Sequence, residues 1–109
     1  MERLIIFYLN ENEKKIIGKF IESSDTNEGK RMLLNWADGS QIHGIYDSFI
    51  EDENDYDLDE DGYEEFWSFV FEVIDTKGNP PVYITEDNYF LINYRNFPDE
   101  ILVDGIKIN

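Results

Sequence analysis

Cysteine is absent from this sequence of 109 residues, and histidine occurs once, as His43. Without thiols the chain can form no disulfide, no thiolate metal site and no cysteine nucleophile. The sequence also contains no G-x-S-x-G elbow, so a Ser-His-Asp triad is not indicated and we interpret His43 as an ordinary strand residue. The seven glycines are dispersed singly, which leaves no glycine-rich loop for binding phosphates.

Two strong helix formers are also nearly absent, since Ala37 and Gln41 are the only alanine and glutamine. Isoleucine, valine, threonine and the aromatic residues together make up 38 of the 109 positions, and these side chains suit pleated, half-buried surfaces. We therefore predict an all-β fold, or a β-rich α+β fold with at most one helix. The expected architecture is a small meandering barrel or sandwich of about eight short strands, in a single domain that spans residues 1–109.

Basic residues are few, with 9 against 25 acids and a net charge of −16. This charge repels phosphate backbones and anionic membrane surfaces, so we expect no direct nucleic-acid binding and no membrane binding. A basic protein is the favoured partner. The N-terminal apolar run, Leu4 to Leu9, is too short for a signal-peptide core or a membrane span. We accordingly expect a soluble, cytoplasmic protein.

Apolar runs separated by turn-forming residues mark the expected strands. They are Leu4 to Leu9, Lys15 to Glu22, Arg31 to Trp36, Gln41 to Ile50, Val82 to Thr85, Tyr89 to Tyr94, Ile101 to Val103 and Ile106 to Ile108. Asp38-Gly39 and Asp104-Gly105 are typical of tight hairpin turns, because glycine accepts the positive φ that such a turn needs.

The segment from Glu65 to Asp75 is the most apolar and fits either a strand or a helix. As a strand it directs alternate side chains to the core: Trp67, Phe69, Phe71 and Val73. As a helix it has a narrow polar stripe opposite an apolar face. Its aromatic and β-branched residues favour the strand.

Residues 51–65 carry ten acids and no base, so we predict a loop or insertion that its own charge keeps from packing. This segment has two interpretations, a docking surface for a basic protein or a solubilising loop without a partner. The candidate protein-binding residues are Glu51, Asp52, Glu53, Asp55, Asp57, Asp59, Glu60 and Asp61.

The pattern Asp57-x-Asp59-x-Asp61-Gly62 matches the first half of an EF-hand calcium loop, and Glu65 lies where a water-mediated ligand belongs. The second half fails, because Ser68 occupies the twelfth position, where a bidentate glutamate is expected. We expect no cofactor unless Ca²⁺ binds here. The candidate metal ligands are Asp57, Asp59, Asp61 and Glu65.

The aromatic residues also allow two interpretations, a cage for a cationic side chain or core packing, and core packing is favoured. The cage candidates are Trp36, Tyr46, Tyr83, Tyr89 and Tyr94. In size and charge, though in no motif, the chain resembles inhibitors of nucleases and nucleic-acid-binding enzymes, among them toxin-neutralising immunity proteins. We therefore expect a non-enzymatic module that binds a basic protein as an inhibitor or immunity-type partner. A calcium-binding module is the alternative, and a carboxylate-based enzyme is a minor one.

Overall fold

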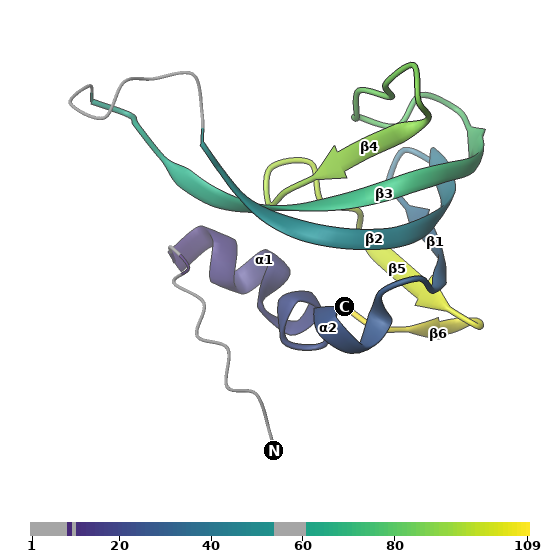
Figure 1. Cartoon of the computed structure of the whole chain (residues 1–109), viewed down its shortest axis with the longest axis horizontal. Coiled ribbons are helices and arrows are strands. Elements are labelled where there is room, and N and C mark those ends of the chain that lie inside the picture. Colours follow the sequence, from purple (N-terminus) through teal and green to yellow (C-terminus); the bar gives the residue numbers. More distant parts are fainter. Residues whose placement is uncertain (1–8, 10, 54–60) are drawn as a thin grey trace.

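Six antiparallel strands form one sheet in the computed structural model, which describes residues 9, 11–53 and 61–109. The strand order is β4-β3-β2-β1-β5-β6, and two helices lie against one face of the curved sheet (Figure 1). The strands are β1 (Arg31–Asn35), β2 (Gln41–Glu53), β3 (Glu65–Lys77), β4 (Tyr89–Ile92), β5 (Glu100–Val103) and β6 (Ile106–Lys107). The predicted β-rich class is confirmed. A single sheet of six described strands replaces the expected barrel or sandwich of about eight, and two short helices replace at most one.

The helix α1 (Glu11–Glu22) lies where we predicted a strand over Lys15 to Glu22, so that prediction was wrong. Ile17, Phe20 and Ile21 recur at spacings of three and four residues, and a helix turns all three toward the sheet. A strand would have placed them on both faces. A second helix, α2 (Ser24–Asn27), occupies part of the polar segment that follows. The twelve residues of α1 make it the longest described helix, and no described helix has the length and apolar character of a membrane span.

Both predicted Asp-Gly turns are confirmed. Gly39 has a φ of 90° between β1 and β2, and Asp104 and Gly105 have φ values of 52° and 81° between β5 and β6. The Asp38 carboxylate accepts hydrogen bonds from Ser40 Oγ at 2.6 Å and from the Ser40 backbone N–H at 2.9 Å. These bonds lower the pKa of Asp38, because they favour its charged form.

The ambiguous segment from 65 to 75 is a strand, β3, and the predicted inward orientation of Phe69 and Phe71 is confirmed, since both are fully buried. Phe20 of α1 packs edge-on against Phe69 with ring centroids 4.7 Å apart, and against Tyr46 of β2 at 5.5 Å. Trp67, also predicted to face inward, is only partly buried but packs against the same core. The core therefore lies between the helices and the middle of β2 and β3.

A β-bulge at Asp47 changes which side chains of β2 face the core. Tyr46 pairs with Phe71, but the next pairs are Ser48 with Val70 and Phe49 with Phe69, so Asp47 has no partner on β3. Phe49 thus lies on the same face of the sheet as Phe69, and packs against the core. The residues that follow Phe49 are shifted as well, and Ile50 is directed to the outer face.

Residues 82–85 do not form the predicted strand but part of a loop beside the edge of β4. The Thr85 backbone N–H donates to the Tyr89 carbonyl at 2.9 Å, and Thr85 Oγ1 accepts from the Tyr89 backbone N–H at 3.1 Å. Thr85 thus occupies the hydrogen-bonding groups that another strand would need. The predicted strand from Leu4 to Leu9 lies outside the described residues except for Leu9, which has no regular structure.

Candidate protein-binding surface

The hairpin of β2 and β3 continues beyond the core, and its end projects from the rest of the molecule (Figure 1). Pairing extends through Asp52 with Phe66 to Glu53 with Glu65. We call residues 51–53 and 61–67 the acidic arm. The prediction of a loop over 51–65 was therefore wrong at both ends, because the aromatic pair at 66 and 67 extends β3 and draws β2 along with it.

Six acids lie on the described part of the arm: Glu51, Asp52, Glu53, Asp61, Glu64 and Glu65. Four of the eight predicted protein-binding residues are among them, Glu51, Asp52 and Glu53 on β2 and Asp61 in a turn. The other four lie outside the described residues: Asp55, Asp57, Asp59 and Glu60. The structure thus places the described candidates together on one projecting element.

Tyr63 lies between two carboxylates that face each other across the arm. Its hydroxyl is 2.7 Å from Glu53 Oε2 and 3.0 Å from Glu65 Oε1, and it donates its single hydrogen to this pair. The hydrogen bond to Glu53 and the nearby negative charges raise the pKa of Tyr63, because ionisation would add a third negative charge. A hydrogen bond therefore moderates, without neutralising, the repulsion of two like charges directly opposite each other.

Glu64 connects the arm to the loop that follows β4. Arg95 Nη2 lies 2.9 Å from Glu64 Oε1, and the Tyr94 hydroxyl donates to the same oxygen at 2.5 Å. The Arg95 guanidinium also lies over the Tyr94 ring, 5.6 Å from its centroid. The hydrogen bond to Tyr94 and the charge of Glu64 raise the pKa of Arg95. This cluster anchors one side of the arm to the body of the protein.

On the face toward the helices, the base of the arm rests on α1. Glu13 is 1% exposed, and its Oε2 accepts a hydrogen bond from the Trp67 backbone N–H at 2.7 Å. The Trp67 ring packs edge-on against Phe49 at 5.6 Å. A buried carboxylate of α1 thus holds the point where β3 leaves the core.

The predicted calcium ligands are only partly described. Asp57 and Asp59 lie outside the described residues, Asp61 is exposed in the turn, and Glu65 accepts the hydrogen bond from Tyr63. Within residues 9, 11–53 and 61–109, no three carboxylate or histidine side chains lie close enough to hold a metal ion. Calcium binding at Asp57, Asp59, Asp61 and Glu65 stays a prediction.

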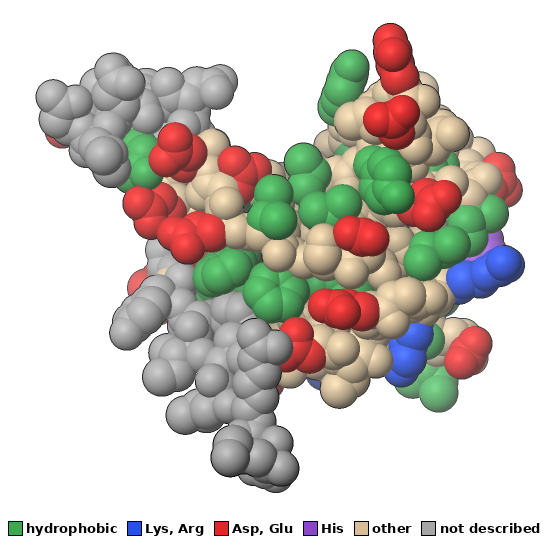
Figure 2. Space-filling model, in the orientation of Figure 1, with side chains coloured by type: hydrophobic (Ala, Val, Ile, Leu, Met, Phe, Trp, Pro, Cys, Tyr) green, Lys and Arg blue, Asp and Glu red, His purple; other side chains and the backbone are tan. Residues whose placement is uncertain are grey.

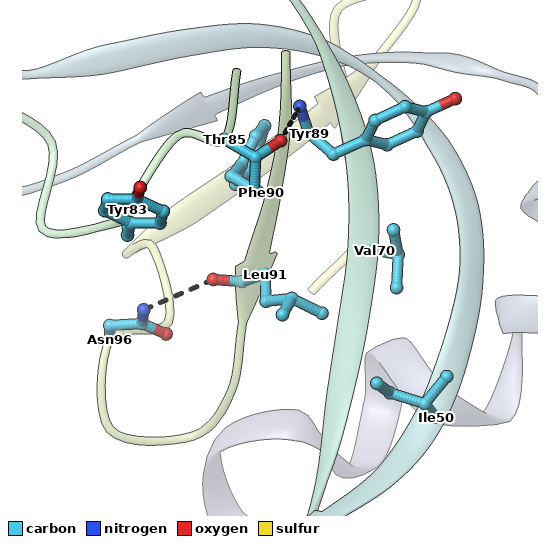
Figure 3. Close-up of a pocket in the computed structure, with 8 residues that line it drawn as sticks. All are labelled: Ile50, Val70, Tyr83, Thr85, Tyr89, Phe90, Leu91 and Asn96. Carbon is cyan, nitrogen blue, oxygen red and sulfur yellow. Dashed lines mark hydrogen bonds between the residues drawn. The ribbon is translucent and has the colours of Figure 1, made fainter. Parts of the chain in front are cut away.

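An apolar groove of about 430 Å³ lies on the outer face of the sheet, over β3 and β4. Its walls include Ile50 of β2, Val70 of β3, Leu91 of β4 and Tyr83 of the loop before β4 (Figure 3). Figure 2 shows apolar side chains grouped on this face of the molecule, with acidic side chains among and around them.

The groove was not predicted, because apolar strand residues such as those that line it are expected to lie in the core. Alternation in β4 does separate Phe90 and Ile92, which are buried, from Tyr89 and Leu91, which are exposed. The sequence carries no sign that the second pair stays uncovered.

The five aromatic residues considered for a cage do not come together. Tyr46 is in the core, and Trp36 is 9% exposed and donates its indole N–H to the Asn96 carbonyl. Tyr94 belongs to the cluster with Glu64, while Tyr83 and Tyr89 line the groove. Core packing therefore accounts for only part of this set.

Residues 12–108 match the model of a protein family described as cognate immunity protein YxxD. The chain belongs to this family. Comparison with curated proteins and with solved structures gave no match. Membership supports an immunity-type role, hence a toxin partner, and favours the expectation that the chain acts without catalysis.

Proposed function

We propose that this immunity-family protein neutralises a basic cognate toxin by binding it, and that the acidic arm makes the first contact. The family supports the toxin partner, and the charge of the arm supports a basic one. As part of the same proposal, binding takes place in the cytoplasm and requires neither a cofactor nor catalysis by this chain.

The charge distribution carries the proposal. Residues 32–76, which run from β1 through the β2–β3 hairpin, contain fourteen acids and no lysine or arginine. The remaining residues contain all nine bases and eleven acids, so they are close to neutral. The negative field is therefore concentrated on one hairpin, where it attracts a basic protein and accelerates its association.

The position of the arm adds to its effect. Glu51, Glu53 and Glu65 are exposed on an element that projects beyond the sheet (Figure 1). Arg95, which forms an ion pair with the arm in the described structure, is already engaged by Glu64. A basic partner therefore meets uncompensated carboxylates before it reaches the body of the protein.

Capture with the purified protein from its native cell lysate, at low and at high salt, identifies the candidate toxin. The captured protein is then expressed in a sensitive host with and without this chain. We expect growth arrest by the toxin alone, relief on co-expression, and binding that weakens as salt screens the arm.

Two triple variants with equal loss of charge then test the arm. The first, Glu51→Gln, Asp52→Asn and Glu53→Gln, should lower the association rate about tenfold at low salt. The second removes three exposed acids near the helices, Glu22→Gln, Asp25→Asn and Glu28→Gln, and should leave the rate nearly unchanged. Equal loss in both would mean that net charge, and not the arm, attracts the toxin. A captured protein that arrests no growth would contradict the immunity role itself.

A further inference from the structure

The outer face of β3 and β4 is apolar, although no described element covers it. Leu91 is 40% exposed, Ile50 42% and Tyr83 80%. One face of an antiparallel sheet normally packs on the core while the other is polar and faces water. Large apolar side chains gathered on an open face, rimmed by polar residues, are typical of a binding site.

The loop before β4 gives this face the shape of a groove. Asn96 Nδ2 donates to the Pro81 carbonyl at 3.2 Å and to the Leu91 carbonyl at 3.5 Å, which holds the loop against the edge of β4. In Figure 3, Tyr83 and Asn96 lie on one side of β4, and the Leu91 side chain points from β4 toward the other side. The volume of about 430 Å³ is within the range of sites that hold one or two large side chains.

The edge of β4 is already occupied, which determines the mode of binding. Tyr89 exchanges both backbone groups with Thr85, and the Leu91 carbonyl accepts from Asn96. A partner strand would have to break these bonds before it could pair. The groove is therefore suited to a side chain inserted from above, and not to strand addition.

Carboxylates lie on the strands and on the loop that form the groove. Glu72 of β3 is paired directly with Tyr89 on this face, and Asp47 accepts a hydrogen bond from Ser48, the partner of Val70. Further acids follow Thr85 in the loop and Ile50 in β2: Glu86, Asp87 and Asp52. An apolar pocket within a negative rim is complementary to an apolar side chain with basic neighbours.

We propose that this groove receives an aliphatic or aromatic side chain of the cognate toxin, presented by a segment that carries lysine or arginine on either side of it. The partner's identity as a toxin rests on the proposed function. The arm and the groove then have different tasks: the charges of the arm set the association rate, and the buried anchor sets the dissociation rate.

A small probe tests the chemistry of the groove without the toxin. Tryptamine carries an indole with an ammonium group, and indole-3-acetate carries the same ring with a carboxylate. We expect tryptamine to shift the amide NMR signals of Val70, Tyr89 and Leu91, with little shift from indole-3-acetate. Equal binding of the two, or shifts confined to other residues, would overturn the proposal.

Leu91→Gln should lower the affinity for tryptamine at least fivefold, because it removes the apolar wall and leaves every nearby carboxylate in place. The control is Ile106→Gln on β6, which removes a more exposed aliphatic side chain (68% exposed) at the opposite edge of the sheet. Tyr83→Ser is a second groove variant on the loop, where a loss of sheet stability is not expected. Unchanged tryptamine affinity in both groove variants would contradict the assignment.

The toxin, once captured, separates this proposal from the proposed function. We expect Leu91→Gln to raise its dissociation rate about tenfold and to leave the association rate and its salt dependence nearly unchanged. Tight toxin binding that is insensitive to Leu91→Gln and Tyr83→Ser would contradict the proposed role of the groove and would still support the immunity role. Tryptamine binding in the groove without any toxin neutralisation would support the proposed ligand chemistry of the groove and contradict the immunity role.

Discussion

The two ends of the β2–β3 ribbon contrast in what they contribute. At the inner end, Tyr46, Phe69 and Phe71 are fully buried and pack against Phe20 of α1. At the outer end, Glu53 faces Glu65 in an exposed pair of like charges. Apart from the bulge at Asp47, backbone pairing runs from one end to the other, so the same two strands provide stability at one end and a concentrated negative charge at the other. A surface held for binding can carry unfavourable charges when the stabilising contacts lie elsewhere on the same element.

The largest effect is expected at the inner end. Phe69→Ala should lower the free energy of unfolding by about 3–5 kcal/mol, because it opens a cavity among aromatic rings. Leu91→Ala on the outer face is the control and should cost far less, since Leu91 is 40% exposed. Urea unfolding at fixed ionic strength measures both. A urea unfolding midpoint of Phe69→Ala close to that of the parent would mean that β3 is not the centre of the core.

A smaller effect is expected at the junction of the two ends. Glu13→Gln keeps the shape of the side chain but replaces a charged acceptor for the Trp67 N–H with a neutral one. We expect a loss of about 1–2 kcal/mol, the usual range for a buried hydrogen bond to a charged group. Glu22→Gln, an exposed residue of the same helix, should cause no loss. Equal behaviour of the two variants in urea unfolding would contradict the role of Glu13.

At the outer end a substitution should even help folding slightly. Glu53→Gln removes one of two opposed charges while its amide oxygen can still accept from Tyr63. The melting temperature should rise at low salt, and the gain should shrink as salt screens the remaining charges. Thermal melts of Glu53→Gln and Glu22→Gln across a salt series provide the test. A clear destabilisation by Glu53→Gln would show that the arm carries stability after all.

The smallest effect concerns calcium. Because Ser68 cannot close the incomplete loop, we predict diffuse binding, with millimolar or weaker affinity for both Ca²⁺ and Mg²⁺ that falls with ionic strength. Parallel calorimetric titrations, with melting curves, measure this. Micromolar Ca²⁺ binding that Asp59→Ala abolishes and salt barely changes would make the acidic segment a metal site in its own right.

Local signals predicted the short-range features well. The Asp-Gly pairs specified two hairpin turns, because the positive φ at Gly39, Asp104 and Gly105 is a property of those residues and their neighbours. Aromatic and β-branched enrichment correctly favoured a strand for residues 65–75. The acids concentrated in residues 51–65 include those on the acidic arm, which projects from the sheet.

Two segments were wrongly predicted as strands. Ile17, Phe20 and Ile21 lie in a window that composition assigned to a strand, yet their three- and four-residue spacing belongs to a helix. Residues 82–85 have strand-forming side chains, but Thr85 bonds Tyr89 in a turn-like loop instead of pairing along a ladder. In both segments the secondary structure depends on contacts with residues outside the segment itself.

The sequence by itself determined that this protein is β-rich and that most of its net negative charge lies in residues 32–76, since composition and charge need no tertiary partner. Only the tertiary structure decided which apolar residues stay exposed. The bulge at Asp47 reverses the alternation of β2, so Phe49 joins the core and Ile50 reaches the outer face beside Val70. Whether a residue is covered depends on what packs above it, and both helices cover the opposite face of the sheet (Figure 1).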